Sequence, residues 1–533
     1  MKQLNLRRGL VALLTVAACI ALVVAVRFAT NTGEPQATAA DKAEAKGITK
    51  LVKGEGWAMF GGTIYRNNVN TVDTGIPTEF DVKKGTNVKW SIDLGSLAYG
   101  GPIVADGKIF IGTNNERPRD PKVQGDKGIL MCFNEANGKF LWQAVHDKLE
   151  AGRVQDWPKE GICSSPCVEG KKLYYVSNRC ELVCAGTEDG KPIWNLDMIK
   201  KLGVFPHNLS TSSPMIIGDL IFVITSNGVD EGHFNIPAPN APSFIAVEKA
   251  TGDVKWAKNY PGKNIMHGQW ACPVYADTSG TPHVIYPGGD GWLYGLDMQT
   301  GNILWKFDAN PKDAVYILGP KGTKNDFVAT PIVYEDHLYI GVGQDPEHKE
   351  GVGHLWCIDL AKALKYGKTN ADHDVSSELV VTPGDPVKKI KVVSKPNPQS
   401  AMAWHFGGKA PADADRPYVF GRTLSTCAVH DGLVYVCELA GFFHCLDAKT
   451  GKHLWEHETG ANSWSSPYWV DGKVFQCNDA GQIFIFAHGK EKKQLGEPIE
   501  TEAKYVRATP VVANGVLYVM TETPTKLYAL QKK

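Results

Sequence analysis

Two short runs of the sequence place carboxylate and imidazole side chains close together along the chain. They are "GVDEGH", with Asp230, Glu231 and His233, and "GQDPEHKEGVGH", with Asp345, Glu347, His348 and His354. Carboxylates and imidazoles are both ligands for divalent metal ions. Neither run has the spacing of a known metal motif, so a metal site and ordinary polar loops are both open interpretations.

A second chemistry that the sequence offers is a disulfide bond. Cys427 and Cys437 flank the stretch "AVHDGLVYV", whose central Asp-Gly turn predicts a hairpin. The two thiols would then lie nearly opposite each other, as a cross-strand disulfide in an oxidising compartment requires.

The elements that carry these residues repeat along the chain. A small residue, a Gly-containing turn and a tryptophan recur together, as in "GLDMQTGNILW" and "CLDAKTGKHLW". This column of tryptophans, expected to pack neighbouring units together, consists of Trp90, Trp142, Trp194, Trp256, Trp305, Trp404 and Trp455. Cys132, Cys184, Cys357 and Cys445 hold the small position and are expected to be core residues.

A second unit, a hairpin that usually begins with proline, precedes each of these turns. Examples are "VATPIVYEDHLYIG" and "WSSPYWVDGKVFQC". Its eight anchor positions are Pro102, Pro166, Pro214, Pro273, Pro331, Cys427, Pro467 and Pro510. Together the two units predict an all-β protein, an eight-bladed β-propeller of four-stranded antiparallel blades. A strand around Trp90 is expected to complete the last blade and so close the ring.

These units resemble those of the PQQ-binding-like (pyrroloquinoline-quinone-type repeat) β-propeller family. The likeness is carried by the "TGxxxW" and proline-hairpin units and by stretches such as "WAMFGGTIYRNNV" and "PGGDGWLYGLD". It extends from Trp57 to the C-terminus and is nearest to members from planctomycete bacteria. The resemblance implies a fold shared with the assembly lipoprotein BamB and with quinoprotein dehydrogenases. One such scaffold hosts many functions.

The long loops of such a propeller should gather on one face, around the mouth of the central channel. Residues just before the first strand of each blade should converge there. Those with polar or aromatic side chains are Glu160, His207, Asn208, His267, Gln269, Asp326, Arg422, Asn462, Trp464 and Arg507. They suit a pocket for a small polar ligand, and a solvated funnel without a ligand is the alternative.

The quinoprotein resemblance implies PQQ bound over a calcium ion, with an aspartate base and a disulfide ring between adjacent cysteines. Glu160 and Asn208 hold positions suited to calcium ligands. However, the chain has no Cys-Cys dipeptide, no C-x-x-C-H haem motif and no carboxylate in "NIMHGQWACP", where a base is expected. The sequence therefore supports the fold better than the catalysis and favours a protein that is not an enzyme.

The N-terminus has the pattern of a membrane segment. Residues 1–8 are a basic, cytoplasmic tail, residues 9–26 are uncharged and apolar, residues 27–54 read as a flexible linker, and residues 55–533 form the propeller. An uncleaved anchor, a cleaved signal peptide and a lipid anchor at Cys19 remain alternatives. Each places the propeller outside the cytoplasm, in the periplasmic cell envelope.

The balanced net charge and the long loops on one face together favour a protein-binding function. Lys+Arg and Asp+Glu both number 57, which gives no support to nucleic-acid binding. We expect a membrane-tethered scaffold that binds an envelope protein through its loop-rich face, in the manner of BamB. The alternative is a PQQ-dependent oxidoreductase with its cofactor in the funnel.

Overall fold

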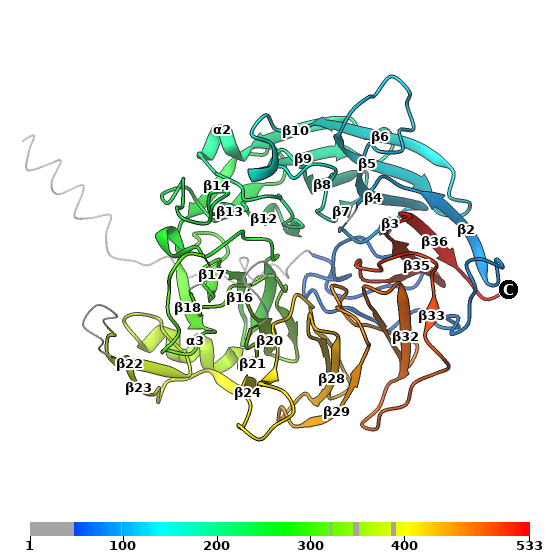
Figure 1. The fold of residues 1–533 in the computed structure, drawn as a ribbon. Coiled ribbons are helices and arrows are strands. Elements are labelled where there is room, and N and C mark those ends of the chain that lie inside the picture. Colours follow the sequence, from blue (N-terminus) through cyan, green and yellow to red (C-terminus); the bar gives the residue numbers. More distant parts are fainter. Residues whose placement is uncertain (1–46, 98, 320–321, 345–350, 385–390) are drawn as a thin grey trace, which may run out of the picture. The chain divides into compact units, whose positions relative to one another are not determined.

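The chain forms an eight-bladed β-propeller of four-stranded antiparallel sheets, as the repeats predicted. The structure is a computed structural model that describes residues 47–97, 99–319, 322–344, 351–384 and 391–533. Residues 47–533 are one compact unit. Successive blades follow one another around a ring, with the short first strands innermost (Figure 1).

The first four blades each take four consecutive strands. Blade one consists of β3 (Ile103–Ala105), β4 (Lys108–Asn114), β5 (Lys127–Asn134) and β6 (Phe140–Asp147), and blade two of β7 (Cys167–Glu169), β8 (Lys172–Val176), β9 (Glu181–Gly186) and β10 (Pro192–Asp197). Blade three consists of β11 (Met215–Ile217), β12 (Leu220–Ile224), β13 (Phe244–Glu248) and β14 (Val254–Lys258). Blade four consists of β15 (Val274–Thr278), β16 (Thr281–Pro287), β17 (Trp292–Asp297) and β18 (Ile303–Asp308).

The last four blades contain the additions to the pattern. Blade five consists of β19 (Ile332–Tyr334), β20 (His337–Val342), β21 (His354–Asp359), β24 (Met402–Lys409) and β25 (Tyr418–Phe420), and blade six of β26 (Ala428–His430), β27 (Leu433–Cys437), β28 (Phe442–Asp447) and β29 (His453–Glu458). Blade seven consists of β30 (Tyr468–Val470), β31 (Lys473–Cys477), β32 (Gln482–Ala487) and β33 (Ile499–Glu500), with β1 (Val69–Asn70) on its inner edge. Blade eight consists of β34 (Val511–Ala513), β35 (Val516–Thr521), β36 (Lys526–Leu530) and β2 (Val88–Asp93). In the eighth blade β2 pairs with β36.

Two α-helices and one extra hairpin lie outside the blades in the part of the chain that the structure describes. Helix α2 (Met198–Leu202) follows β10, and helix α3 (Leu360–Thr369) follows β21. The hairpin of β22 (Glu378–Thr382) and β23 (Val393–Pro396) lies between α3 and β24. Helix and hairpin thus replace the tight turn between the third and fourth strands of blade five.

The tryptophan column has a repeated geometry. Each tryptophan lies on the fourth strand of its blade and is the register partner of the small residue on the adjacent third strand. Trp142, for example, is opposite Cys132, and Trp455 is opposite Cys445. The indole Nε1 of Trp142 donates to the carbonyl of Thr187 in the next blade, 3.1 Å away. Five other members donate in the same way, so the column joins neighbouring blades.

Trp305 departs from this pattern because blade five lacks the turn on which it would pack. Helix α3 lies there instead, and a Cβ at Gly367 would be only 2.2 Å from the carbonyl oxygen of Leu304. The indole lies over its own blade, where a Cβ at Gly295 would be 2.2 Å from the ring. Glycine at this position of the column therefore makes room for the displaced tryptophan.

A segment from the N-terminal side, residues 57–73, passes all eight blades in turn; because it crosses each of them, we call it the crossing segment. Its backbone accepts from the amides of Val104, Val168, Tyr275, Val333 and Trp469, each the second residue of a first strand or its equivalent. Asn67 pairs with Val429, and Asn70 donates to the carbonyl of Val512. The fully buried Arg66 donates to carbonyls of Ser213, Pro214 and Pro273.

The disulfide expected between Cys427 and Cys437 does not form. All described cysteines are free and buried. Ala428 pairs with Tyr435, so Cys427 falls beside Val436 and is offset by one residue from Cys437. An offset of one turns the two side chains to opposite faces of the blade, into separate apolar clusters.

No helix among the described residues is both long and apolar enough to cross a membrane. The expected anchor, residues 9–26, lies outside the described residues.

Candidate functional site: the central funnel

The central channel holds a cavity of about 350 Å³. Four of the expected funnel residues line it: Glu160, Asn208, Trp464 and Arg507. Each lies in the loop just before the first strand of its blade, where successive first strands bring these loops together. Phe60 of the crossing segment also lines the cavity. That segment contacts the first strands or the residues just before them in all eight blades, which places Phe60 beside the cavity.

Aromatic rings make up much of the wall. Tyr99 stacks on Trp464 with ring centroids 6.1 Å apart, and Trp157 and Trp270 line the cavity with them. Sequence reasoning missed these three residues and Phe60. Tyr99, Trp157 and Trp270 precede first strands, as the expected residues do, whereas no local signal marks Phe60.

Arg507 is the centre of a charged network in the wall. Its guanidinium meets both carboxylate oxygens of Asp479 at 3.3 Å and Glu522 at 3.5 Å. It also lies over the rings of Trp464 and Tyr505, at 5.1 and 4.1 Å from their centroids. The cation is therefore balanced by carboxylates and held in one orientation.

Two buried carboxyl groups, Glu160 in the cavity lining and Glu522 beside Arg507, titrate near neutral pH. Burial raises the pKa of Glu160 to about 7, against the opposing effect of the Tyr99 hydroxyl, which donates to it at 3.3 Å. Burial likewise raises the pKa of Glu522 to about 7, and Arg507 opposes that rise. The charge of the funnel consequently changes in the physiological range.

The other expected residues lie outside this cavity. Gln269 is structural, because its amide bonds to Asn227 and Ser243 and accepts from Gly289. Asp326 and His267 line a second, small cavity, and Arg422 and Asn462 line a third.

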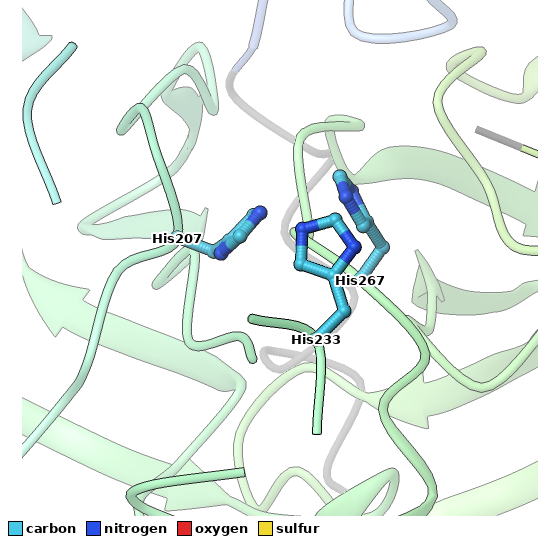
Figure 2. A group of neighbouring side chains, drawn as sticks. All are labelled: His207, His233 and His267. Atoms are coloured by element: carbon cyan, nitrogen blue, oxygen red, sulfur yellow. The ribbon is translucent and has the colours of Figure 1, made fainter. Parts of the chain in front are cut away.

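His207 and His267 meet His233 from the run "GVDEGH", and their ligating nitrogens all lie within 4.8 Å of one another. The three imidazoles point toward one another (Figure 2). The sequence placed His207 and His267 in the funnel and His233 in a candidate metal loop, without joining the two sets.

Of the second candidate metal run, His354 is the one candidate ligand among the described residues. His354 is buried, and its Nδ1 is 2.9 Å from Nε2 of His405. Burial lowers the pKa of His354 to about 3, which keeps this ring neutral inside its aromatic surroundings. Asp345, Glu347 and His348 lie outside the described residues.

The residues of the funnel do not fit the PQQ site that the quinoprotein resemblance implies. PQQ is a tricarboxylate, and Arg507 is the one cation among the described residues that line the cavity; two carboxylates already neutralise it. The lining cysteines, Cys163 and Cys272, are free and belong to different blades. Glu160 and Asn208 do share the cavity.

Fold and repeats define the class as a propeller of the PQQ-type repeat. The model of the family described as "Outer membrane protein assembly factor BamB" matches residues 126–381 and 391–533, and the chain belongs to this family. A search of curated proteins found no match.

Solved structures that are similar to this chain include a BamB and a quinohemoprotein alcohol dehydrogenase. BamB from Moraxella catarrhalis is 14% identical, with a TM-score of 0.51 over 83% of this chain and 97% of that one. Quinohemoprotein alcohol dehydrogenase from Comamonas testosteroni is 12% identical, with a TM-score of 0.47 over 90% of this chain and 80% of that one. At these identities the likeness concerns the fold alone.

Proposed function

We propose that this protein is a membrane-tethered scaffold of the cell envelope that binds a protein partner through the loop-rich face of its propeller. Membership of the BamB family supports this role. The observation that carries it is a group of exposed apolar side chains on that face. Phe234 is 79% exposed, and Ile317 and Val315 are 48% and 39% exposed.

The two loops that carry these side chains are neighbours. Phe234 lies between β12 and β13 of blade three, and Val315 and Ile317 lie between β18 and β19 at the start of blade five. A Cβ at Gly319 would be 3.8 Å from the carbonyl oxygen of His233. The two loops therefore adjoin, and both carry exposed apolar side chains.

Hydrogen bonds to Asp230 order the turn that carries Phe234. Its amide donates to Oδ1 of Asp230 at 2.8 Å, and Asn235 donates to Oδ2 of the same carboxylate at 2.8 Å. A large apolar anchor on an ordered turn loses little conformational entropy when a partner covers it. Such an anchor suits a partner that offers an apolar pocket or segment.

The proposal is tested with a photocrosslinking amino acid at position 234 of the full-length chain in membranes. We expect a discrete partner adduct at 234 and none at Lys171, an exposed residue in the turn between β7 and β8 on the opposite face. The same partner should co-purify with the wild type and be lost with Phe234→Asp. Val380→Asp, which changes an equally apolar, 48% exposed residue of the β22–β23 hairpin, is the matched control. Equal recovery with both variants would contradict the proposal.

The quinoprotein alternative is tested by adding PQQ and Ca²⁺ to the purified protein and recording its absorption spectrum. The funnel residues described above lead us to expect no stoichiometric binding. Binding accompanied by dye-linked alcohol oxidation would overturn the scaffold proposal.

The proposed membrane tether is the apolar segment of residues 9–26. If this segment anchors the protein, the protein should stay in the membrane pellet after carbonate extraction.

A further inference from the structure

We propose that His207, His233 and His267 bind a first-row transition-metal ion, with Zn²⁺ the expected occupant. The three side chains come from separate loops: before β11, between β12 and β13, and before β15. Their ring centroids lie 4.5 to 5.0 Å apart. Three imidazoles from three loops thus converge on one point (Figure 2).

The geometry is close to that of a bound ion. A tetrahedral zinc with Zn–N bonds of about 2.0–2.1 Å places its ligand nitrogens about 3.4 Å apart. The ligating atoms of this cluster already lie within 4.8 Å of one another. The rings are inclined at 69° to 87° to one another, so they are not stacked as a simple aromatic cluster. Small side-chain rotations would bring the nitrogens to coordinating distance.

One ligand is already oriented as metal-binding histidines are. Nδ1 of His207 is 2.9 Å from the carbonyl oxygen of Val229. A carbonyl only accepts, so Nδ1 carries a proton, and in the neutral ring Nε2 is the nitrogen whose lone pair would bind a metal ion. A second ring nitrogen that donates to a backbone carbonyl fixes the tautomer and orientation of a ligand.

The backbone around the cluster makes room for it. A Cβ at Gly228 would lie 2.5 Å from Cβ of His207 and 2.9 Å from the carbonyl oxygen of His267. A Cβ at Gly268 would lie 2.4 Å from the ring of Trp270, which packs on His267 with centroids 5.0 Å apart. These two glycines let the loops of blades three and four approach closely enough for the imidazoles to meet.

His233 is held in place by a tight turn. Its φ is +57°, a conformation that few non-glycine residues adopt. Its amide donates to the carbonyl of Asp230 at 3.1 Å, and the Asp230 amide donates to the carbonyl of Asn235 at 2.9 Å. Bending the loop back in this way directs His233 toward His207 and His267.

The ligand set indicates the class of metal. Imidazole nitrogens suit Zn²⁺, Co²⁺, Ni²⁺ and Cu²⁺, whereas Ca²⁺ and Mg²⁺ prefer oxygen. Three protein ligands leave a coordination position for water or for a group of another molecule.

A second group, His444, His453 and Glu456, also has clustered donor atoms. Those three residues lie on two adjacent strands of blade six, β28 and β29, and Glu456 is exposed, whereas the histidines of the first group come from three separate loops. This second group therefore serves as the control.

The test is a Zn²⁺ titration by calorimetry and a Co²⁺ titration by visible absorption, on chelator-treated full-length protein without a histidine tag. We expect one equivalent of Zn²⁺, a raised thermal midpoint on binding, and the d–d bands of tetrahedral Co²⁺. His233→Ala removes a partly exposed ligand, so it should fold as the wild type does. It should weaken Zn²⁺ binding at least about 100-fold, because losing a ligand costs more than losing an outer-shell partner.

The variant His453→Ala should bind Zn²⁺ as the wild type does. Circular dichroism of the metal-free proteins verifies that both variants are folded. Failure of the wild type to bind a stoichiometric ion, or unchanged affinity in His233→Ala, would overturn the inference. These outcomes are independent of the scaffold proposal, because Phe234→Asp leaves all three imidazoles in place.

Discussion

At the scale of single residues, the funnel is distinguished by carboxyl groups that burial keeps protonated up to neutral pH. Glu160 is 8% exposed, bonds to Tyr99 and has a pKa of about 7. In the unfolded chain a glutamate titrates near 4.3. Between these two pH values the folded state holds more protons than the unfolded state, so stability falls as pH rises.

Replacing Glu160 by Gln should remove this fall. We expect the free energy of unfolding of Glu160→Gln to exceed that of the wild type by up to about 3 kcal/mol at pH 8, and by little at pH 4.5. Urea unfolding measured from pH 4.5 to 8.5 gives the comparison. The exposed Glu497→Gln should follow the wild-type curve. If Glu160→Gln also follows the wild-type curve, the Glu160 carboxyl of the folded protein is charged throughout this pH range.

At the scale of elements, tryptophan and glycine act as a pair that joins neighbouring blades. In blades one to four and in blade six, the glycine of the third-to-fourth-strand turn lies against the tryptophan of the preceding blade. A Cβ at Gly451, for example, would be 2.6 Å from the ring of Trp404. The turn glycine is thus required twice, once for its positive φ and once for this contact. Blade five, which replaces its turn with α3, displaces Trp305 accordingly.

Two glycines of blade six separate these requirements. Gly451 and Gly432 have φ of +70° and +74°, but a Cβ at Gly432 would meet nothing within 4 Å. We expect Gly432→Ala to cost about 1–2 kcal/mol, from its left-handed backbone alone. Gly451→Ala should cost about 1–3 kcal/mol more, from overpacking against Trp404. Urea unfolding of both variants measures the difference, and equal losses would show that the ring moves aside freely.

At the scale of the whole molecule, the crossing segment connects all the blades. Arg66 is its most buried charged group, and its guanidinium donates hydrogen bonds to carbonyls: Phe60 within the segment, Ser213 and Pro214 in blade three, and Pro273 in blade four. The fork of arginine suits several carbonyls at once, whereas lysine offers a single point charge.

Arg66→Lys should therefore destabilise the protein by about 2–4 kcal/mol, because buried carbonyls lose their donors. Arg117→Lys is the control: Arg117 is half-exposed and pairs with Asp93, so its change should stay within about 0.5 kcal/mol. Thermal and urea midpoints of the two variants give the measurement. A loss no larger in Arg66→Lys than in Arg117→Lys would mean that the crossing segment contributes little to stability.

The sequence by itself determined the blades. Alternating apolar strands, tight turns and the tryptophan spacing are local patterns, and each blade is built from one stretch of chain, so eight repeated stretches specify eight sheets. The same reasoning indicated the loop-rich face and placed Glu160, Asn208, Trp464 and Arg507 around one channel.

Tertiary structure alone decided which side chains meet across blades. His233 lies in a long loop whose path no repeat specifies, and only its turn at Asp230 brings it to His207 and His267. The crossing segment depends on contacts with residues up to hundreds of positions away. The one-residue offset that separates Cys427 from Cys437 is fixed by strand register. In each case the outcome depends on relative position in space, which a local pattern does not encode.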